Sequence, residues 1–300
     1  MIIGIYGAGQ MGTAFALNLR NLAHQVVVYN RTPDHLEHFK HESGIQVTSD
    51  VAEFMSKLGA KKTVWLFVPF EVLDDVIESM TPHLQPGDVL IDGGNSHYRA
   101  TIWRHGRLKE KGIGFIDTGI SGGIKKDRES VNLMVGGDRE FVAPLEKVFV
   151  EMSYEGGYAY LGPSGAGHYA KMVHNGIEYA MMSAIGEGFG IIEAAPYDYD
   201  LQELASLWSN GSVLEGKLMR YTSDALAGYS EFDAIAPKVG TSGEAGWTLQ
   251  ESIEKHLSIP TIAAALFSRF KSTDETNISE KLVALLRRSV GGHDIYKKGE

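Results

Sequence analysis

The first half of the chain alternates short apolar runs with stretches of helical periodicity. Apolar residues at every third or fourth position predict helices, whereas short apolar runs bounded by turn residues predict buried strands. Stretches such as EVLDDVIESM separate some of the runs, and strands separated by helices are typical of a parallel sheet. We therefore predict a doubly wound α/β domain over residues 1–163. Its expected strands are residues 2–6, 25–29, 63–68, 88–92, 114–117 and 132–135.

After residue 163 the periodicity is helical, and no convincing alternating strand pattern follows. Residues 164–195 predict one long helix, with Ser164 as its N-cap and Pro196 just beyond its end. We therefore predict an all-α second domain over residues 164–300. Its further helices are expected over residues 201–218, 247–256, 260–270 and 278–288.

Four polar side chains share one face of the long helix. Lys171, His174, Asn175 and Glu178 stand at i, i+3, i+4 and i+7, so they form one stripe about two turns long. A buried helix with such a stripe either holds a network of paired side chains or faces a cavity. The helix pattern alone leaves both alternatives open. Burial is expected from the apolar residues around the stripe, which are Met172, Val173, Ile177, Met181 and Met182.

The composition is that of an ordinary globular protein, with 300 residues of which 43% are hydrophobic. The chain lacks cysteine, an apolar run of the roughly 18 residues that span a membrane, and a charged leader, so we expect a cytoplasmic protein. A formal net charge of −10 argues against nucleic acid as the main partner. It leaves room for a small anionic substrate, which needs only a local group of cations.

Three closely spaced histidines, His35, His38 and His41, invite comparison with a metal site. They lie in the polar stretch DHLEHFKHES, which offers no frame that excludes water. We therefore predict a solvated helix face there and expect no metal in the protein.

Gly7, Gly9 and Gly12 form the pattern G-x-G-x-x-G directly after the first expected strand, and a helical stretch follows. In this context the glycines permit a tight turn, close approach of a pyrophosphate, and close packing of helix on strand. The free amides at the start of the helix then face the phosphates. The turn predicts a dinucleotide-binding domain.

The residues after the second expected strand favour NADP. An NAD site usually places Asp or Glu there to hold the ribose 2′-hydroxyl. This chain has Asn30, Arg31 and Thr32, so no carboxylate repels a 2′-phosphate and the Arg31 fork can hold one. We expect NADP as the preferred cofactor and NAD as the second choice. The residues expected to contact it are Gly7, Gly9, Gln10, Met11, Gly12, Asn30, Arg31, Thr32, Val68 and Asn95.

Three loops beyond the expected strands combine small residues with polar ones: VPFE, DGGNS (92–96) and TGISGG (118–123). Such loops let backbone amides approach an oxyanion, and ligands of doubly wound sheets bind at this edge. Residues 119–123 also match G-x-S-x-G, but the following IKKDRES lacks the apolar helix that a hydrolase nucleophile elbow requires. The loops therefore predict a ligand-binding edge without a serine nucleophile.

A nicotinamide cofactor together with a Lys–Glu pair predicts hydride transfer assisted by acid–base catalysis. A lysine partly desolvated beside apolar residues can be neutral enough to accept a hydroxyl proton. Lys171 is then the candidate base and Glu178 the candidate acid, while His174 and Asn175 would hold hydroxyl or carboxylate oxygens. A buried ion-pair network is the structural alternative for the same residues.

The motifs GAGQMG, IDGGNS, GISGG and GAGHYAKMVHNGIEY closely resemble those of the decarboxylating 6-phosphogluconate dehydrogenases, over nearly the whole chain. At 300 residues the chain resembles the short form of that family, which lacks a second helical repeat. The related 3-hydroxyisobutyrate and tartronate semialdehyde dehydrogenases share the glycine turn and the SGG loop. They generally lack DGGNS and the His-Asn pair followed by Glu-Tyr.

The resemblance implies oxidative decarboxylation of 6-phosphogluconate to ribulose 5-phosphate and CO2 without a metal. Lys171 would be the general base while the third carbon of 6-phosphogluconate is oxidised, and Glu178 would protonate the first carbon of the enediol that remains after CO2 has left. Tyr179 and Arg269 match positions near the phosphate. The positions that match substrate-binding residues of the family are Asn95, Ser121, Gly122, Gly123, His174, Asn175, Tyr179, Arg269, Arg287 and His293.

The C-terminal stretch shares the resemblance. Arg287 and His293 match the closing R-x5-H motif, which in the family enters the neighbouring subunit's active site, so we expect a homodimer or homotetramer. Two positions depart from the family. Gly246 stands where a cation is usual, so one substrate contact is missing or comes from elsewhere, and Asn30 replaces the acidic residue of many NAD-preferring short members.

Two other functions remain open for this fold. A β-hydroxyacid dehydrogenase of the 3-hydroxyisobutyrate or tartronate semialdehyde type would oxidise its substrate without releasing CO2. A non-catalytic nucleotide-sensing protein would be expected to have lost Lys171 or Glu178, and both are present.

Overall fold

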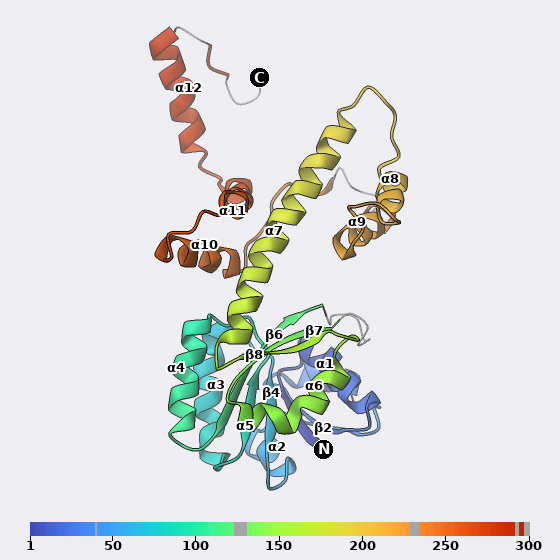
Figure 1. The fold of residues 1–300 in the computed structure, drawn as a ribbon, viewed down its shortest axis with the longest axis vertical. Helices are drawn as coiled ribbons and strands as arrows, with labels where there is room; N and C mark the ends of the chain where they lie inside the picture. The colour runs from blue at the N-terminus through green and yellow to red at the C-terminus, as the bar shows by residue number, and fades with distance from the viewer. Residues whose placement is uncertain (40, 123–130, 229–233, 292–293, 297–300) are drawn as a thin grey trace. The chain divides into compact units, whose positions relative to one another are not determined.

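The computed structural model describes residues 1–39, 41–122, 131–228, 234–291 and 294–296 (Figure 1). The chain divides into two compact units, Met1–Gly176 and Ile177–Glu300. The long helix α7 (Ala166–Glu193) contains the point of division. The domain boundary that the sequence predicts after residue 163 lies just before this helix and stays a prediction.

Within the described residues, unit 1 contains one sheet of eight strands, which confirms the predicted doubly wound fold. Their spatial order is β3 (Ile45–Thr48), β2 (Gln25–Tyr29), β1 (Ile2–Tyr6), β4 (Thr63–Leu66), β5 (Val89–Asp92), β6 (Gly114–Ser121), β7 (Asn132–Gly136) and β8 (Tyr158–Gly162). The strands from β3 to β6 are parallel, β7 is antiparallel to β6, and β8 is parallel to β7. The antiparallel strand lets β6 extend four residues beyond its predicted end, because β7 pairs with it up to Ser121.

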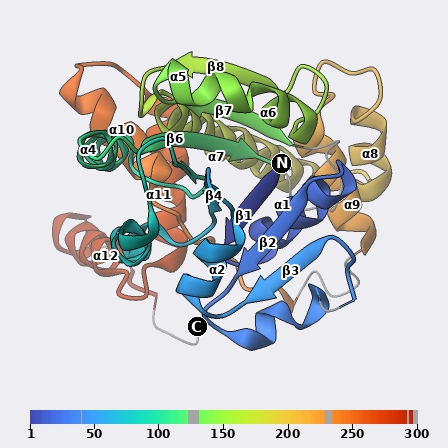
Figure 2. The same ribbon diagram turned by 90° about the horizontal axis from the view of Figure 1, so that it is seen from below.

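Helices cover both faces of this sheet. One face carries α1 (Gln10–Asn21), the 3-10 helix η1 (Pro33–Phe39) and α6 (Glu146–Met152). The other carries α2 (Val51–Lys57), α3 (Leu73–Met80) and α4 (Tyr98–Lys109), so that α1 and α2 lie on opposite sides of the strands (Figure 2). Side chains alternate along each strand, as in β4, where Trp65 packs on Phe15 of α1 and Leu66 packs into the core under α2. The short segments η2 (Phe70–Val72), η3 (Thr81–His83), α5 (Arg139–Val142) and η5 (Ala143–Leu145) complete the connections.

A buried aspartate on the sheet anchors the start of α7. Asp117 of β6 is fully buried, and its two carboxylate oxygens accept the backbone N–H groups of Gly165 (2.8 Å) and His168 (2.9 Å). A carboxylate at a helix start satisfies free amides and interacts favourably with the helix dipole. The predicted N-cap, Ser164, is therefore wrong. Its hydroxyl is buried and has no hydrogen-bond partner among the described residues.

Unit 2 is helical in its described part. After α7 come α8 (Leu201–Trp208), α9 (Lys217–Gly228), α10 (Glu244–Glu254), α11 (Pro260–Thr273) and α12 (Ile278–Gly291). The single helix predicted over residues 201–218 is wrong, because the chain leaves the helix after Trp208 and Gly211 takes a φ of +75°. Such a backbone conformation suits glycine and cannot continue a helix.

Several large apolar side chains of unit 2 are exposed in the single chain. Ile177, Met181 and Met182 of α7 are 41–51% exposed, so the burial expected from these apolar residues is wrong for this part of the helix. Helix α12 likewise exposes Leu282, Leu285, Leu286 and Val290. In the described ranges, none of the helices combines the length and apolar character that crossing a membrane requires.

Candidate active site

The glycine turn leaves space above the start of α1. Gly7 has a φ of +105°, and a Cβ there would strike the carbonyl oxygen of Phe67. A Cβ on Gly12 would strike the carbonyl oxygen of Gly7, whereas one on Gly9 would meet nothing within 4 Å. No side chain caps α1 at Gly9, and its first turn holds no acidic residue. The open position beside unpaired amides fits a pyrophosphate, as the motif predicts.

The structure brings the other predicted cofactor residues to the same edge. Ala8 donates its backbone N–H to Asn30 Oδ1 at 3.0 Å, which holds the end of β2 against the turn. Val68 borders the glycine turn, because a Cβ added at Gly7 would lie 3.4 Å from Val68 Cγ1. Gln10 and Met11 form the first turn of α1, and the side chains of Arg31 and Thr32 are exposed beyond β2.

Asn95 lies in a loop that a chain of polar contacts holds in place. Asp92 accepts the backbone N–H of Gly94 at 3.0 Å and the hydroxyl of Ser96 at 2.7 Å. Arg104 of α4 is only 5% exposed and reaches Ser96 Oγ at 3.5 Å. These contacts leave the Asn95 side chain exposed beyond the carboxyl end of β5, where a ligand of such a sheet binds.

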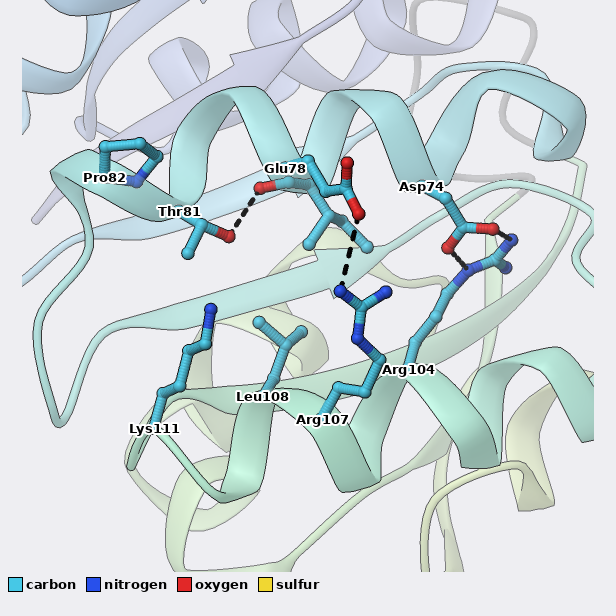
Figure 3. Close-up of a pocket in the computed structure, with 9 residues that line it drawn as sticks. Asp74, Glu78, Thr81, Pro82, Arg104, Arg107, Leu108 and Lys111 are labelled. Atoms are coloured by element: carbon cyan, nitrogen blue, oxygen red, sulfur yellow. Dashed lines mark hydrogen bonds and ion pairs between the residues drawn. The ribbon is translucent and has the colours of Figure 1, made fainter.

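Arg104 also lines a groove of about 280 Å³ between α3 and α4 (Figure 3). Two ion pairs line it: Arg104 Nε lies 2.7 Å from Asp74 Oδ1, and Arg107 Nη2 lies 3.4 Å from Glu78 Oε1. The groove extends to the C-terminal ends of both helices, which lead toward the amino ends of β5 and β6. Ligands of doubly wound sheets bind at the opposite edge, so this groove is not the candidate active site.

Close packing on the sheet positions Lys171. Helix α7 approaches β6 and β7 at three glycines, Gly119, Gly136 and Gly167. A Cβ on Gly119 would come within 2.5 Å of Lys171 Cβ, and a Cβ on Gly136 would come within 2.8 Å of the Gly167 nitrogen. Lys171 is therefore held directly on β6 and is 8% exposed.

Three further residues of the predicted site meet beside Lys171. His174 Nδ1 lies 3.1 Å from Asn175 Oδ1, and His174 Nε2 lies 3.3 Å from Ser121 Oγ at the end of β6. In a neutral imidazole, Nδ1–H then donates to the amide oxygen and Nε2 accepts from the serine hydroxyl. Gly122, with a φ of +77°, continues from Ser121. Gly123 lies outside the described residues.

Two predicted residues of unit 2 are in direct contact. The Arg269 guanidinium carbon lies 3.5 Å from the centre of the Tyr179 ring, and Arg269 donates to the Gly240 carbonyl at 3.1 Å. The Tyr179 hydroxyl lies 3.1 Å from Ser242 Oγ and accepts the Ser242 N–H, also at 3.1 Å. Tyr179 is 7% exposed and belongs to the small core formed with Ala245, Ala265 and Leu266.

Of the remaining predicted residues, Glu178 is half-buried on α7 and Arg287 is exposed on α12, while His293 lies outside the described residues. The sequence did not point to Asp117 or Arg104 as residues that support the site, because their partners are distant along the chain.

In the described part of the chain, no group of three or more His, Cys, Asp or Glu side chains could hold a metal ion.

Comparison with known families matches both halves of the chain. Residues 2–162 match the NAD binding domain of 6-phosphogluconate dehydrogenase, and residues 167–290 match the 6-phosphogluconate dehydrogenase C-terminal domain. The Bacillus subtilis protein YqeC is 38% identical over 298 residues, which cover 99% of this chain and 100% of that one. An NAD(+)-dependent, decarboxylating 6-phosphogluconate dehydrogenase of Haloferax volcanii is 32% identical, with 100% of both chains covered.

A similar solved structure is that of Plasmodium falciparum 6-phosphogluconate dehydrogenase, described in its apo form and in complex with NADP+ and with 6-phosphogluconate. It superimposes with a TM-score of 0.83 at 28% identity, and the match covers 100% of this chain and 67% of that one.

Proposed function

This chain belongs to the 6-phosphogluconate dehydrogenase family, and on that basis we propose that it oxidatively decarboxylates 6-phosphogluconate to ribulose 5-phosphate. One observation carries the proposal beyond family membership. Lys171 is held on β6 through Gly119, beside the linked side chains of Ser121, His174 and Asn175. An amine that could act as a base thus stands with several groups that could bind oxygens, and oxidation of a polyhydroxy acid requires both.

Residues of unit 1 would hold the cofactor. The first-turn amides of α1 would bind the pyrophosphate over Gly9, and Val68 and Asn95 would border the nicotinamide. When bound, the nicotinamide accepts a hydride from the substrate carbon. We propose NADP as the preferred form, because exposed Arg31 and Thr32 follow β2 and no carboxylate stands there.

Lys171 would take the proton of the hydroxyl on the third carbon while that carbon loses its hydride. The product is a β-keto acid, whose carboxylate leaves as CO2 with the bonding electron pair delocalised onto the keto oxygen. Lys171, now protonated, can return its proton to that oxygen, which gives an enediol. Glu178 would then protonate the first carbon. This carbon is the first carbon of the enediol, which was the second carbon of the substrate. As it is protonated, Lys171 would take the proton of the adjacent hydroxyl, which leaves the keto group of ribulose 5-phosphate. Glu178 stands seven residues after Lys171, about two turns along the same helix.

The remaining side chains would hold the sugar acid in this alignment. Ser121, Gly122, Gly123, His174 and Asn175 would bind its carboxylate and hydroxyl oxygens. Arg269, oriented by its stacking on Tyr179, would bind the phosphate.

We also propose that the active site is completed by a second copy of the chain. Arg287 and His293 of one subunit would enter the active site of its neighbour. The exposed Leu282, Leu285 and Leu286 of α12 support this proposal, because more than half of each side chain is left to solvent in the single chain.

The direct test is reduction of each cofactor, followed by absorbance, with 6-phosphogluconate and with 3-hydroxyisobutyrate as substrates. The proposal expects turnover of 6-phosphogluconate, faster with NADP at equal concentration. Turnover of 3-hydroxyisobutyrate alone would assign the chain to the non-decarboxylating relatives. For the acid, Glu178→Gln should slow turnover while 6-phosphogluconate still binds, whereas Glu187→Gln, at an exposed position of the same helix, should not.

A further inference from the structure

The histidines after β2 form a row that leads from the proposed 2′-phosphate position back to the glycine turn. Side chains at i and i+3 of a 3-10 helix eclipse one another, with about 6 Å between successive turns. The His35 backbone N–H donates to the Thr32 carbonyl at 3.3 Å, which continues this spacing into η1. Thr32, His35 and His38 therefore stand above one another along one edge, and all three side chains are exposed.

The opposite edge of η1 is fixed in the core. Leu36 and Phe39 are 6% and 1% exposed and pack with residues of α1 and β2. This anchoring determines which edge of the short helix faces outward. The burial of Leu36 and Phe39 therefore fixes the positions of His35 and His38 on the outward edge of η1.

A hydrogen bond ties the far end of the row to the nucleotide-binding turn. His38 Nε2 lies 3.2 Å from Oγ1 of Thr13, on the first turns of α1. Thr13 Oγ1 also donates to the carbonyl of Ala8, inside the glycine turn, at 3.3 Å. The hydroxyl proton is thus used, and His38 Nε2–H donates to Thr13. A protonated imidazole keeps this bond and gains a second N–H at Nδ1.

Groups of both charges stand on the elements around the row. On η1 itself stand Asp34 and Glu37, and beyond it stand His41 and Glu42. On α1, which packs against η1, Arg20 is paired with Glu42 at 2.8 Å. The packed strands β2 and β3 contribute no Asp, Glu, Lys, Arg or His. Arg31, one residue before Thr32, is the nearest permanent cation in sequence.

We propose that His35 and His38 extend the Arg31 site for the ribose 2′-phosphate, so that discrimination between NADP and NAD increases as the pH falls. His35, one turn from Thr32, would contact the phosphate, and His38, held by Thr13, would position the row and add charge. Histidine is the residue type whose charge changes most readily in the physiological pH range, so the test spans pH 8 to pH 6. The inference rests on the proposed use of NADP.

The test measures binding, not turnover. Calorimetric titration with 2′,5′-ADP and with 5′-AMP isolates the 2′-phosphate, and the ratio of the two dissociation constants is followed from pH 8 to pH 6. The 2′-phosphate itself takes up a proton near pH 6, which weakens binding. The protonation of the free probe is the same for every variant, so comparison with the wild type removes that part of the pH dependence.

Relative to His35→Gln/His38→Gln, the wild-type preference for 2′,5′-ADP should increase by roughly three- to tenfold over this pH range, the scale of an exposed charge-assisted contact. His41→Gln should behave like the wild type, because η1 ends at Phe39 and the i, i+3 alignment does not extend to His41. His35→Lys carries its charge at both ends of the range, so it should show the strong preference already at pH 8. Thermal melting of each variant checks that the exposed substitutions leave the fold intact.

The outcomes separate this inference from the choice of NADP. If the wild type and the double variant both prefer 2′,5′-ADP at pH 8 and have the same pH profile, the role of the histidines is overturned and the choice of NADP is not. A histidine-dependent increase without any preference at pH 8 would support the row and remove Arg31 from the site. Equal binding of the two probes at every pH would overturn both.

Discussion

Gly119 on β6 and Lys171 on α7 approach so closely that a Cβ at position 119 would lie within 2.5 Å of Lys171 Cβ. The candidate base is therefore positioned by the absence of a side chain on the strand beneath it. Any side chain at 119 must push α7 away from β6, because a change of rotamer moves neither Lys171 Cβ nor the Gly167 carbonyl oxygen, which would lie 2.7 Å away.

The first prediction is that Gly119→Ala lowers kcat by roughly ten- to a hundredfold, since misplacing a catalytic group by about 1 Å costs on this scale. Steady-state kinetics and a thermal melt measure the two effects separately. Gly106→Ala is the matched control, because a Cβ at that position of α4 meets nothing within 4 Å. A kcat within twofold of the wild type in Gly119→Ala would show that this contact does not position the base.

Local pattern is sufficient to predict the parts of the site that one segment encodes. The glycine turn, the strand before it and the stripe from Lys171 to Glu178 follow from spacing alone, because a strand or a helix determines which of its residues share a face. The fold class follows for the same reason, from the alternation of apolar runs and helical stretches.

Long-range partners are not visible in the sequence. The cap of α7 comes from Asp117, about fifty residues before the helix, and no local motif distinguishes that aspartate from others at strand ends. Ser164 is the candidate that the local sequence offers, whereas the fold supplies the Asp117 carboxylate as the acceptor. The exposure of Met181 and Met182 has a similar cause, since apolar periodicity predicts a partner surface without identifying it.

A second prediction concerns Asp74 and acid stability. The hydrogen bond from Arg104 holds the pKa of Asp74 below its usual value, against a smaller opposing effect of burial. A lowered pKa in the folded state stabilises the protein above the unfolded value of about 3.9, and this stabilisation is lost as the pH falls through the folded pKa. Urea unfolding should therefore show Asp74→Asn to be less stable than the wild type at pH 7, with a difference that shrinks below about pH 4.

Asp75→Asn is the control for this measurement, because Asp75 stands in the same first turn of α3 and is exposed. It should change the unfolding midpoint little at either pH. A difference for Asp74→Asn that stays constant from pH 7 to pH 3 would mean that the Arg104 pair does not contribute through ionisation of the carboxylate.

The third prediction concerns Arg31. Charge-assisted hydrogen bonds contribute about 1.5–3 kcal/mol each, so Arg31→Ala should weaken NADP binding by roughly ten- to a hundredfold and leave NAD nearly unchanged. Arg31→Lys keeps the charge but loses the planar guanidinium, so its affinity for NADP should lie between those of the wild type and Arg31→Ala. The measurement is kcat/KM for both cofactors in each variant. Equal losses for NAD and NADP would place Arg31 on the adenine and not on the 2′-phosphate.

Asn30 is a poorer place for an engineered switch toward NAD than the sequence indicates. Its Oδ1 accepts from Ala8, and its Nδ2 donates to the Thr32 carbonyl at 2.9 Å. An aspartate at position 30 would still accept the Ala8 N–H, but its second carboxylate oxygen would face the Thr32 carbonyl oxygen without a hydrogen bond. Asn30→Asp combined with Arg31→Ala should therefore favour NAD at some cost in thermal stability.

The fourth prediction concerns subunit sharing. If Arg287 serves the neighbouring site, Arg287→Ala and Lys171→Met should each be nearly inactive, yet unfolding and refolding them together should restore activity. Random pairing gives half mixed dimers with one intact site each, so recovery approaches roughly a quarter of the wild-type value in a dimer. Arg288→Ala, the adjacent residue, should remain active by itself. Mixed oligomers without recovered activity would show that Arg287 acts within its own chain or not at all.

The central claim is that Lys171 is the base of an oxidation coupled to decarboxylation. The most direct measurement is the amount of CO2 released per reduced cofactor from 6-phosphogluconate, in the wild type and in Lys171→Met. The account predicts one CO2 per reduced cofactor in the wild type, and a fall of both rates by about 10²–10⁴-fold in Lys171→Met, the scale of a positioned acid–base group. Calorimetric titration should show that the variant still binds the cofactor. Cofactor reduction without CO2, or near-normal turnover in Lys171→Met, would contradict the account.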